Sequence, residues 1–202
     1  MLKIYVEGGG QRDDLKTKCR QGFSKFFERA GFKGRMPRIV ACGSRNDAYD
    51  SFCTALKQAK SDEFPVLLVD SEEPFDPQDA PWVHLKKRKG DSWDKPEGAS
   101  DEHVYLMVRC MEAWFLADKR CLEKFYGQGF HTNTLSQRTD IENISKQDIF
   151  TGLANATRHC KTKGSYNKGN HSFDILALLD PQRVVAVSPH GKRLIESLLQ
   201  KG

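Results

Sequence analysis

Three carboxylates stand directly after predicted strands and have the chemistry of a metal site. Glu7 follows the first β-rich apolar run, and Asp70 and Glu72 follow the third. In a parallel sheet the carboxyl ends of the strands share one edge, where open α/β sheets bind ligands. Carboxylates gathered there repel one another unless a cation or proton holds them, and oxygen ligands suit Mg²⁺ or Mn²⁺. We therefore predict that Glu7, Asp70 and Glu72 are catalytic metal ligands, although a single acid after a strand is more often a solvated turn residue.

Glu112 is a fourth acid predicted at the same edge. It lies in the apolar stretch 111–116, which follows the fourth predicted strand. Its carboxylate there could add a metal ligand or orient one. The alternative is an acid favoured by the dipole at a helix N-terminus, with Trp114 in the core.

A basic, glycine-rich turn over residues 161–169 could hold phosphate groups. Glycine permits close approach of the backbone, and lysine supplies a point charge. The residues assigned to substrate binding are Lys161, Lys163, Tyr166 and Lys168, together with Gly8 and Arg45 in the turns after the first two strands. A solvated basic loop is the competing interpretation. The run Gly8-Gly9-Gly10 is neither a Walker loop nor a dinucleotide fingerprint, so ATP and NAD binding are not supported.

The elements that must position these residues alternate along the first half of the chain. Strands are predicted at residues 2–6, 38–42, 65–69 and 104–108, with amphipathic helices after the first two. Strand, helix and strand at this spacing imply crossover connections, so the fold class is α/β with a parallel sheet covered by helices. After Tyr126 the signals are helical only. We expect a core over residues 1–126 and a helical C-terminal part over 127–202 that packs on it as one structural unit.

Residues 74–102 form a long insertion without a clear periodic pattern. The segment contains four prolines, Trp82, Trp93 and a run of four cations at residues 86–89. A structureless loop of this length is uncommon in a compact domain unless it is a functional lid. We therefore predict a lid in which Trp93 stacks on a substrate base, the alternative being a tryptophan that pins the loop to the surface.

Composition limits the classes of protein to which the chain can belong. Its 202 residues are 38% hydrophobic and 29% charged, which suits one globular domain and includes no stretch of about 20 apolar residues that could cross a membrane. The first residues show no signal-peptide pattern, so we expect a cytoplasmic location. Six cysteines without a Cys-x-x-Cys pair read as reduced thiols. A net charge of +5 mildly favours a polyanionic partner such as nucleic acid.

The order of the acids and glycines resembles a known domain. A glutamate and glycine after strand one, a glycine turn after strand two and paired acids after strand three resemble the Toprim domain, the metal-binding core of topoisomerases, primases and overcoming-lysogenization-defect (OLD) nucleases. Nearly the whole chain resembles domain-of-unknown-function family 4276, a prokaryotic Toprim-like group. The motifs that carry this resemblance lie at residues 6–10, 35–46, 67–72, 111–118 and 164–168.

The resemblance implies a function for the acids. The Toprim glutamate falls on Glu7, and the Toprim acidic pair falls on Asp70 and Glu72, where glutamate replaces the usual second aspartate. The expected activity is Mg²⁺-dependent cleavage of phosphodiester bonds in DNA or RNA, and the expected setting is prokaryotic defence. The alternative is a non-hydrolytic Toprim-like binding subunit that partners an ATPase, because families of this kind are often encoded beside ATPases.

Overall fold

Four parallel strands form the centre of the protein, in the order β2-β1-β3-β4. A computed structural model describes residues 1–201. The strands are β1 (Leu2–Gly9), β2 (Arg38–Gly43), β3 (Phe64–Asp70) and β4 (Val104–Met107). Each connection passes through helices, as parallel neighbours require. The predicted α/β class with a helix-covered parallel sheet is confirmed.

Alternate side chains of each strand enter two separate hydrophobic clusters. In β1, Ile4 and Val6 enter the larger cluster, and Tyr5 enters the smaller one on the other face. The strand period of two explains this division, because successive side chains point to opposite faces of a sheet. Both faces are therefore covered.

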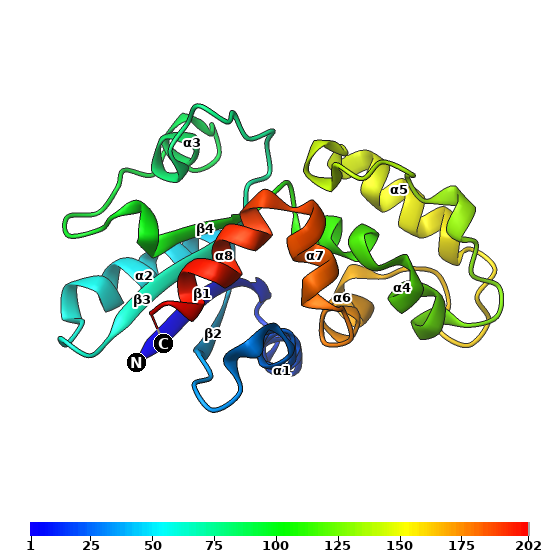
Figure 1. Cartoon of the computed structure of the whole chain (residues 1–202), viewed down its shortest axis with the longest axis horizontal. Helices are drawn as coiled ribbons and strands as arrows, with labels where there is room; N and C mark the ends of the chain where they lie inside the picture. Colours follow the sequence, from blue (N-terminus) through cyan, green and yellow to red (C-terminus); the bar gives the residue numbers. More distant parts are fainter. Residues whose placement is uncertain (202) are drawn as a thin grey trace.

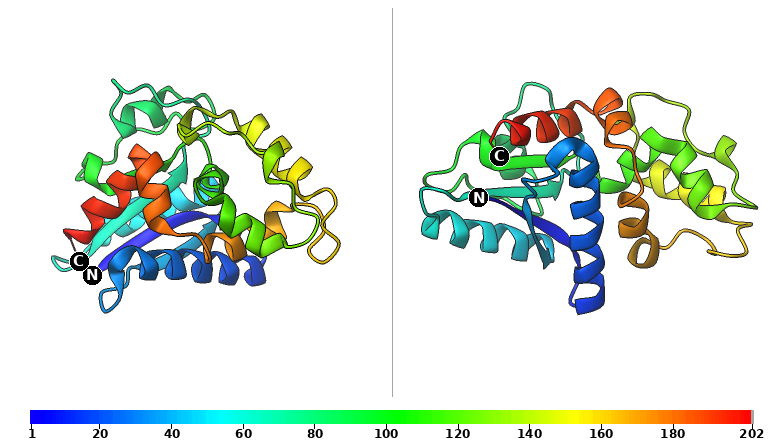
Figure 2. Two further views of the ribbon diagram at one scale, coloured as in Figure 1. Left: turned by 45° about the vertical axis from the view of Figure 1, so that its right-hand side comes forward. Right: turned by 60° about the horizontal axis from the view of Figure 1, so that its bottom comes forward.

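Different helices cover the two faces. The larger cluster involves α1 (Asp13–Phe27), α6 (Lys168–Leu176) and α8 (Pro189–Leu199). On the other face lie α2 (Arg45–Gln58) and the short α3 (Pro81–Lys87). Figures 1 and 2 show α8 returning from the helical part to lie beside β4.

The helical C-terminal part extends the same core beyond the carboxyl ends of the strands (Figure 1). Residues before 127 adjoin it as a 3₁₀ segment at Met111–Asp118 and α4 (Lys119–Tyr126), and within 127–202 it contains α5 (Lys146–Thr157) and α7 (Pro181–Val187). Single 3₁₀ turns at Thr132–Thr134 and Ile141–Asn143 join α4 to α5. Trp114 stacks on Phe26 of α1 with ring centroids 5.2 Å apart, so the larger cluster is continuous between the sheet and these helices.

The segment 74–102 is not the structureless lid that the sequence predicts. It includes α3 and ends in a 3₁₀ turn at Asp101–His103. The Trp82 indole donates a hydrogen bond to the Ser100 carbonyl at 3.0 Å, and the Trp93 ring stacks on Tyr49 of α2 at 4.3 Å. Only 7% of Trp93 is exposed, so its ring is not presented to a substrate base. The tryptophans pin the segment to the domain.

Local capping signals place most of the helix starts that border the site. Ser44 and Asp47 form a capping box that begins α2, Ser145 caps α5 and Asn167 caps α6. These caps supply hydrogen-bond acceptors to the free backbone amides of the first turn.

The sequence does not predict α7, because this helix is short and only a few residues carry its apolar pattern. None of the helices in residues 1–201 is both long and apolar enough to span a bilayer.

Candidate metal and phosphate site

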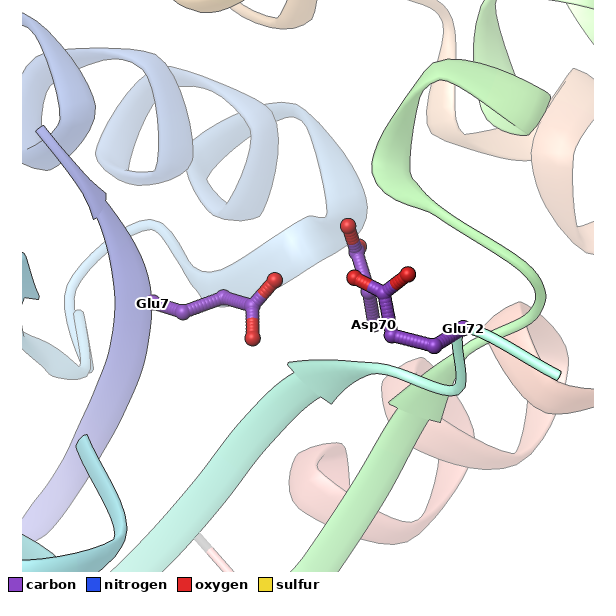
Figure 3. A group of neighbouring side chains, drawn as sticks. All are labelled: Glu7, Asp70 and Glu72. Atoms are coloured by element: carbon purple, nitrogen blue, oxygen red, sulfur yellow. The ribbon is translucent and has the colours of Figure 1, made fainter. Parts of the chain in front are cut away.

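The carboxylates of Glu7, Asp70 and Glu72 converge at the carboxyl edge of the sheet (Figure 3). One oxygen from each lies within 4.8 Å of the others. Glu7 stands near the end of β1, where irregular pairing with Gly43 of β2 interrupts the ladder, and Asp70 is the last residue of β3. The predicted cluster therefore forms, and its spacing could accommodate a single metal ion.

Asp70 is the most buried of the three acids. It is 2% exposed, and its Oδ1 accepts a hydrogen bond from the Met111 backbone amide at 2.8 Å. Burial first, then the negative charges of Glu7 and Glu112, raises the pKa of Asp70 well above its usual range. Without a bound cation, protonation of Asp70 reduces the charge repulsion among these carboxylates at the lowest cost in free energy.

Arg45 does not have a free guanidinium to offer to a phosphate, contrary to the prediction. Its Nη1 donates to Glu7 Oε2 at 3.0 Å and also to the Asp70 carbonyl, while Nε and Nη2 form a fork with the carboxylate of Asp91. Asp91 is almost fully buried and also pairs with Arg88. Arg45 lines a cavity beside the acids, but its guanidinium is engaged in orienting Glu7 and pairing with Asp91.

Glu72 is held by a residue from the helical part. The Nζ of Lys146, at the start of α5, lies 2.5 Å from Glu72 Oε2. Glu72 itself has a positive φ of 64°, and its amide donates to the Arg109 carbonyl, so the backbone turns sharply after β3. This ion pair fixes the third carboxylate and ties α5 to the sheet edge.

Glu112 is completely buried beside the cluster. Its Oε1 accepts hydrogen bonds from the hydroxyls of Tyr166, at 3.0 Å, and Ser172, at 3.2 Å, and lies 3.7 Å from Lys168 Nζ. Its Oε2 is buried with no hydrogen-bond partner among residues 1–201. Burial and the charge of Glu112 raise the pKa of Tyr166, so the phenol remains a donor. An acceptor without a donor in this position suits a cation.

A cavity of about 300 Å³ opens beside these acids. Glu7 and Asp70 lie on one side, the glycine run 8–10 forms part of the floor, and Lys168 and Ser172 of α6 close it. Gly8 has no room for a side chain, because an added Cβ would lie 2.9 Å from the Phe173 ring and 3.1 Å from Cys19 Sγ. Close packing against α6 therefore explains the glycine, which also brings the backbone to the cavity wall.

The predicted basic turn divides between two places. Lys168 lines the cavity. Burial lowers its pKa, but the surrounding negative charges, Glu112 first and then Asp70, together raise it by more. The net shift of the pKa is upward, so Lys168 stays cationic. Tyr166 holds Glu112 from the same side. Lys163 instead lies over the Phe125 ring at 4.7 Å, and Lys161 is exposed outside the cavity. Two of the four residues thus reach the acidic site.

Sequence reasoning missed three residues of the site. Lys146, Asp91 and Ser172 contact it through side chains from distant parts of the chain. Asp91 follows a run of cations and Lys146 follows a helix cap, so neither position carries a pattern that indicates the contact. Ser172 lies one residue after His171 on α6, and only the helix geometry turns its hydroxyl towards Glu112.

The donor set fits a hard divalent cation. Every candidate ligand offers carboxylate oxygen, no thiol or imidazole belongs to the cluster within residues 1–201, and one buried oxygen lacks a partner. Mg²⁺ and Mn²⁺ prefer such oxygen ligands.

Comparison with known families gives one match. The model of the family described as Domain of unknown function (DUF4276) matches residues 6–199. No curated protein and no solved structure matches the chain.

Proposed function

We propose that this chain, which belongs to the DUF4276 family, is a metal-dependent phosphodiesterase that acts on nucleic acid. The observation that carries the proposal is the convergence of Glu7, Asp70 and Glu72 within 4.8 Å beside a cavity that ends in Lys168. The Toprim resemblance supports the same activity, since an acid after strand one and two acids after strand three occupy the corresponding strand ends here. Mg²⁺ or Mn²⁺ is the proposed cofactor.

The three clustered acids would hold the metal, and the nearby negative charge of Glu112, which lies outside this group, would favour the cation. A divalent cation supplies polarisation of a phosphate oxygen and lowers the pKa of a water molecule. Arg45 and Lys146 orient Glu7 and Glu72 through the ion pairs described above, so the carboxylates are preorganised.

Lys168 completes the site on the substrate side. Its side chain is 57% exposed at the cavity and stays cationic, so it can balance negative charge on a phosphate group. Tyr166 and Ser172 hold Glu112 in place through neutral hydroxyl donors, which adds no charge to compete with the substrate. The site thus combines metal-holding acids with a lysine at the cavity.

Cleavage assays with the purified protein test this function. We expect hydrolysis of labelled DNA or RNA, and of bis(para-nitrophenyl) phosphate, with Mg²⁺ or Mn²⁺ but not with EDTA. Asp70→Asn should abolish cleavage, and Lys168→Gln should reduce it by about 10²-fold or more, the scale of losing one electrostatic contact in the transition state.

Glu73→Gln is a matched control. Glu73 is an exposed acid directly after Glu72 and lies outside the cluster, so this variant should retain full activity. Mn²⁺ binding without cleavage of any substrate would refute the enzyme and favour the non-hydrolytic binding subunit that partners an ATPase. Equal activity of wild type and Asp70→Asn would place the chemistry elsewhere.

A further inference from the structure

A second hollow, away from the acidic cluster, lies along α4 and has a volume of about 590 Å³. We call it the α4 hollow. Its lining comes from five separate segments: Arg29 in the π-helical segment Glu28–Phe32 after α1, Asp118 with α4, Lys163 in the basic turn, Leu178 after α6, and residues 180 and 183 at the start of α7. It shares no lining residue with the cavity beside the acids.

Positive charge predominates in the α4 hollow. Five of its ten lining residues are lysine or arginine, and two are aspartate. Arg183 lies 3.5 Å from Asp118 and 3.8 Å from Asp180, so both aspartates of the hollow form ion pairs with this one arginine. The remaining cations therefore have no carboxylate of the hollow to balance them.

Three of these cations are without an acidic partner among residues 1–201. Arg120 and Lys124 are exposed on α4 and form no ion pair, and Lys163 lies over the Phe125 ring without an ion pair. Like charges placed together without counterions create a positive potential that attracts polyanions. The arrangement thus favours a ligand with several negative charges over a single carboxylate.

The floor of the hollow is partly apolar. Phe125 is half-buried there, and Leu178 is 45% exposed, one of the few large apolar side chains on the surface. Cations beside an aromatic ring are the usual combination for a single-stranded nucleic acid, whose bases need apolar contacts as well as paired phosphates. A small inorganic anion would use only the cations.

The α4 hollow and the acidic cavity are close enough for one strand. Lys163 lines the hollow and Lys168 lines the cavity, and five residues of extended chain span at most about 18 Å. A nucleic-acid strand advances about 3.4 Å per nucleotide, so this distance corresponds to roughly five nucleotides.

We propose that the α4 hollow is a second subsite, which binds backbone phosphates of a nucleic-acid strand several nucleotides from the acidic cluster. Its coupling to cleavage rests on the proposed function, whereas its affinity for nucleic acid does not. The subsite gives Lys163 a phosphate-binding role different from the one its sequence context predicts.

Oligonucleotide binding in EDTA tests the subsite without cleavage. The test variant is Arg120→Gln/Lys124→Gln, and the control is Lys57→Gln/Lys60→Gln, which removes the same charge from exposed, unpaired lysines at the far end of α2. Single strands of about 4 and about 16 nucleotides are titrated at several salt concentrations, because the longer strand is long enough to span both places.

The expected result is a weaker salt dependence for the test variant. Removing two phosphate contacts should lower the salt slope by about 1.4, so wild type should lose about sevenfold more affinity than the test variant between roughly 50 and 200 mM salt. The short strand, which can bind the hollow alone, should change in the same direction, whereas hydrolysis of bis(para-nitrophenyl) phosphate should be unchanged. The control variant should match wild type in slope.

Two results would overturn the subsite. One is an equal salt slope for the test and control variants, and the other is no binding of the long strand by wild type. If the test variant loses binding while wild type cleaves nothing with any metal, the subsite stands and the proposed enzymatic function fails.

Discussion

Replacing Asp70 with asparagine should stabilise the metal-free protein. Asparagine keeps the acceptor for the Met111 amide and removes the charge. Two unit charges 4.8 Å apart repel by about 3.5 kcal/mol at an effective dielectric constant of about 20, and Asp70 has two such neighbours in Glu7 and Glu72. Arg45 and Lys146 offset part of this repulsion.

Protonation sets an upper limit on the gain. The wild type avoids the repulsion by keeping a proton on Asp70, which at pH 7 costs about 4 kcal/mol for a carboxyl of ordinary pKa near 3.9. We therefore expect Asp70→Asn to add about 1–4 kcal/mol at pH 7. For a chain of this length that raises Tm by roughly 2–16 °C.

The gain should depend on pH in a defined direction. Because the folded pKa of Asp70 is raised, the folded state retains a proton that the unfolded chain releases above pH of about 4. Wild-type stability therefore falls as pH rises from there, and the fall stops above the folded pKa. The advantage of Asp70→Asn should be absent near pH 4 and grow towards neutral pH.

Thermal unfolding in EDTA and in Mn²⁺, from about pH 4 to pH 8, checks this reasoning. With Mn²⁺ at about 100 times its Kd, wild type should gain about 2.7 kcal/mol and the variant nothing. Glu73→Gln should follow wild type in both buffers. A variant that is less stable than wild type in EDTA at pH 7, with no effect of Mn²⁺ on wild type, would refute the electrostatic account of the site.

Three further predictions concern residues around the site. Trp93→Ala should cost about 3–5 kcal/mol because it empties a buried ring position, lowering Tm with or without metal; a near-normal Tm with weaker binding of single strands would restore the lid. Arg45→Met leaves the buried carboxylate of Asp91 short of a partner, so urea unfolding should show a loss of about 3–5 kcal/mol, and an unchanged midpoint would contradict this. Burial raises the pKa of Glu142, but its hydrogen bonds, chiefly from His190, outweigh this and lower it. The stabilisation by the Glu142 carboxylate is therefore present above its ordinary pKa and disappears as pH falls through the folded pKa. Glu142→Gln should cost about 1.5–3 kcal/mol at pH 7 and little at pH 3. A difference in urea midpoints that does not change with pH would argue against this account.

The parts of the site that could be predicted are those determined by the chain next to a strand. Glu7 and Asp70 were identifiable because strand ends of a parallel sheet share an edge, whatever the details of packing. Lys146 could not be found in this way, since it meets Glu72 across 74 positions of sequence. Lys163 was wrongly assigned to the acidic site, because neighbouring residues in a basic turn face different parts of the surface.

The same distinction applies to the fold. The strands and the two helices between them follow from periodicity and caps, and the observed strands differ from the predicted ones by only a few residues at their ends. The segment 74–102 was misjudged because its order depends on tertiary contacts, such as the stacking of Trp93 on Tyr49. Burial of isolated aromatic residues leaves no periodic signal.

The lysines that hold Glu72 and Glu112 come late in the chain. During synthesis Glu7, Asp70, Glu72 and Glu112 all emerge before Lys146 and Lys168, the two cations that pair with members of this group from the helical part. A nascent chain that ends before Lys146 therefore carries Glu72 and Glu112 without these lysines, although Glu7 already has Arg45. The acidic centre is therefore completed only after most of the polypeptide has left the ribosome.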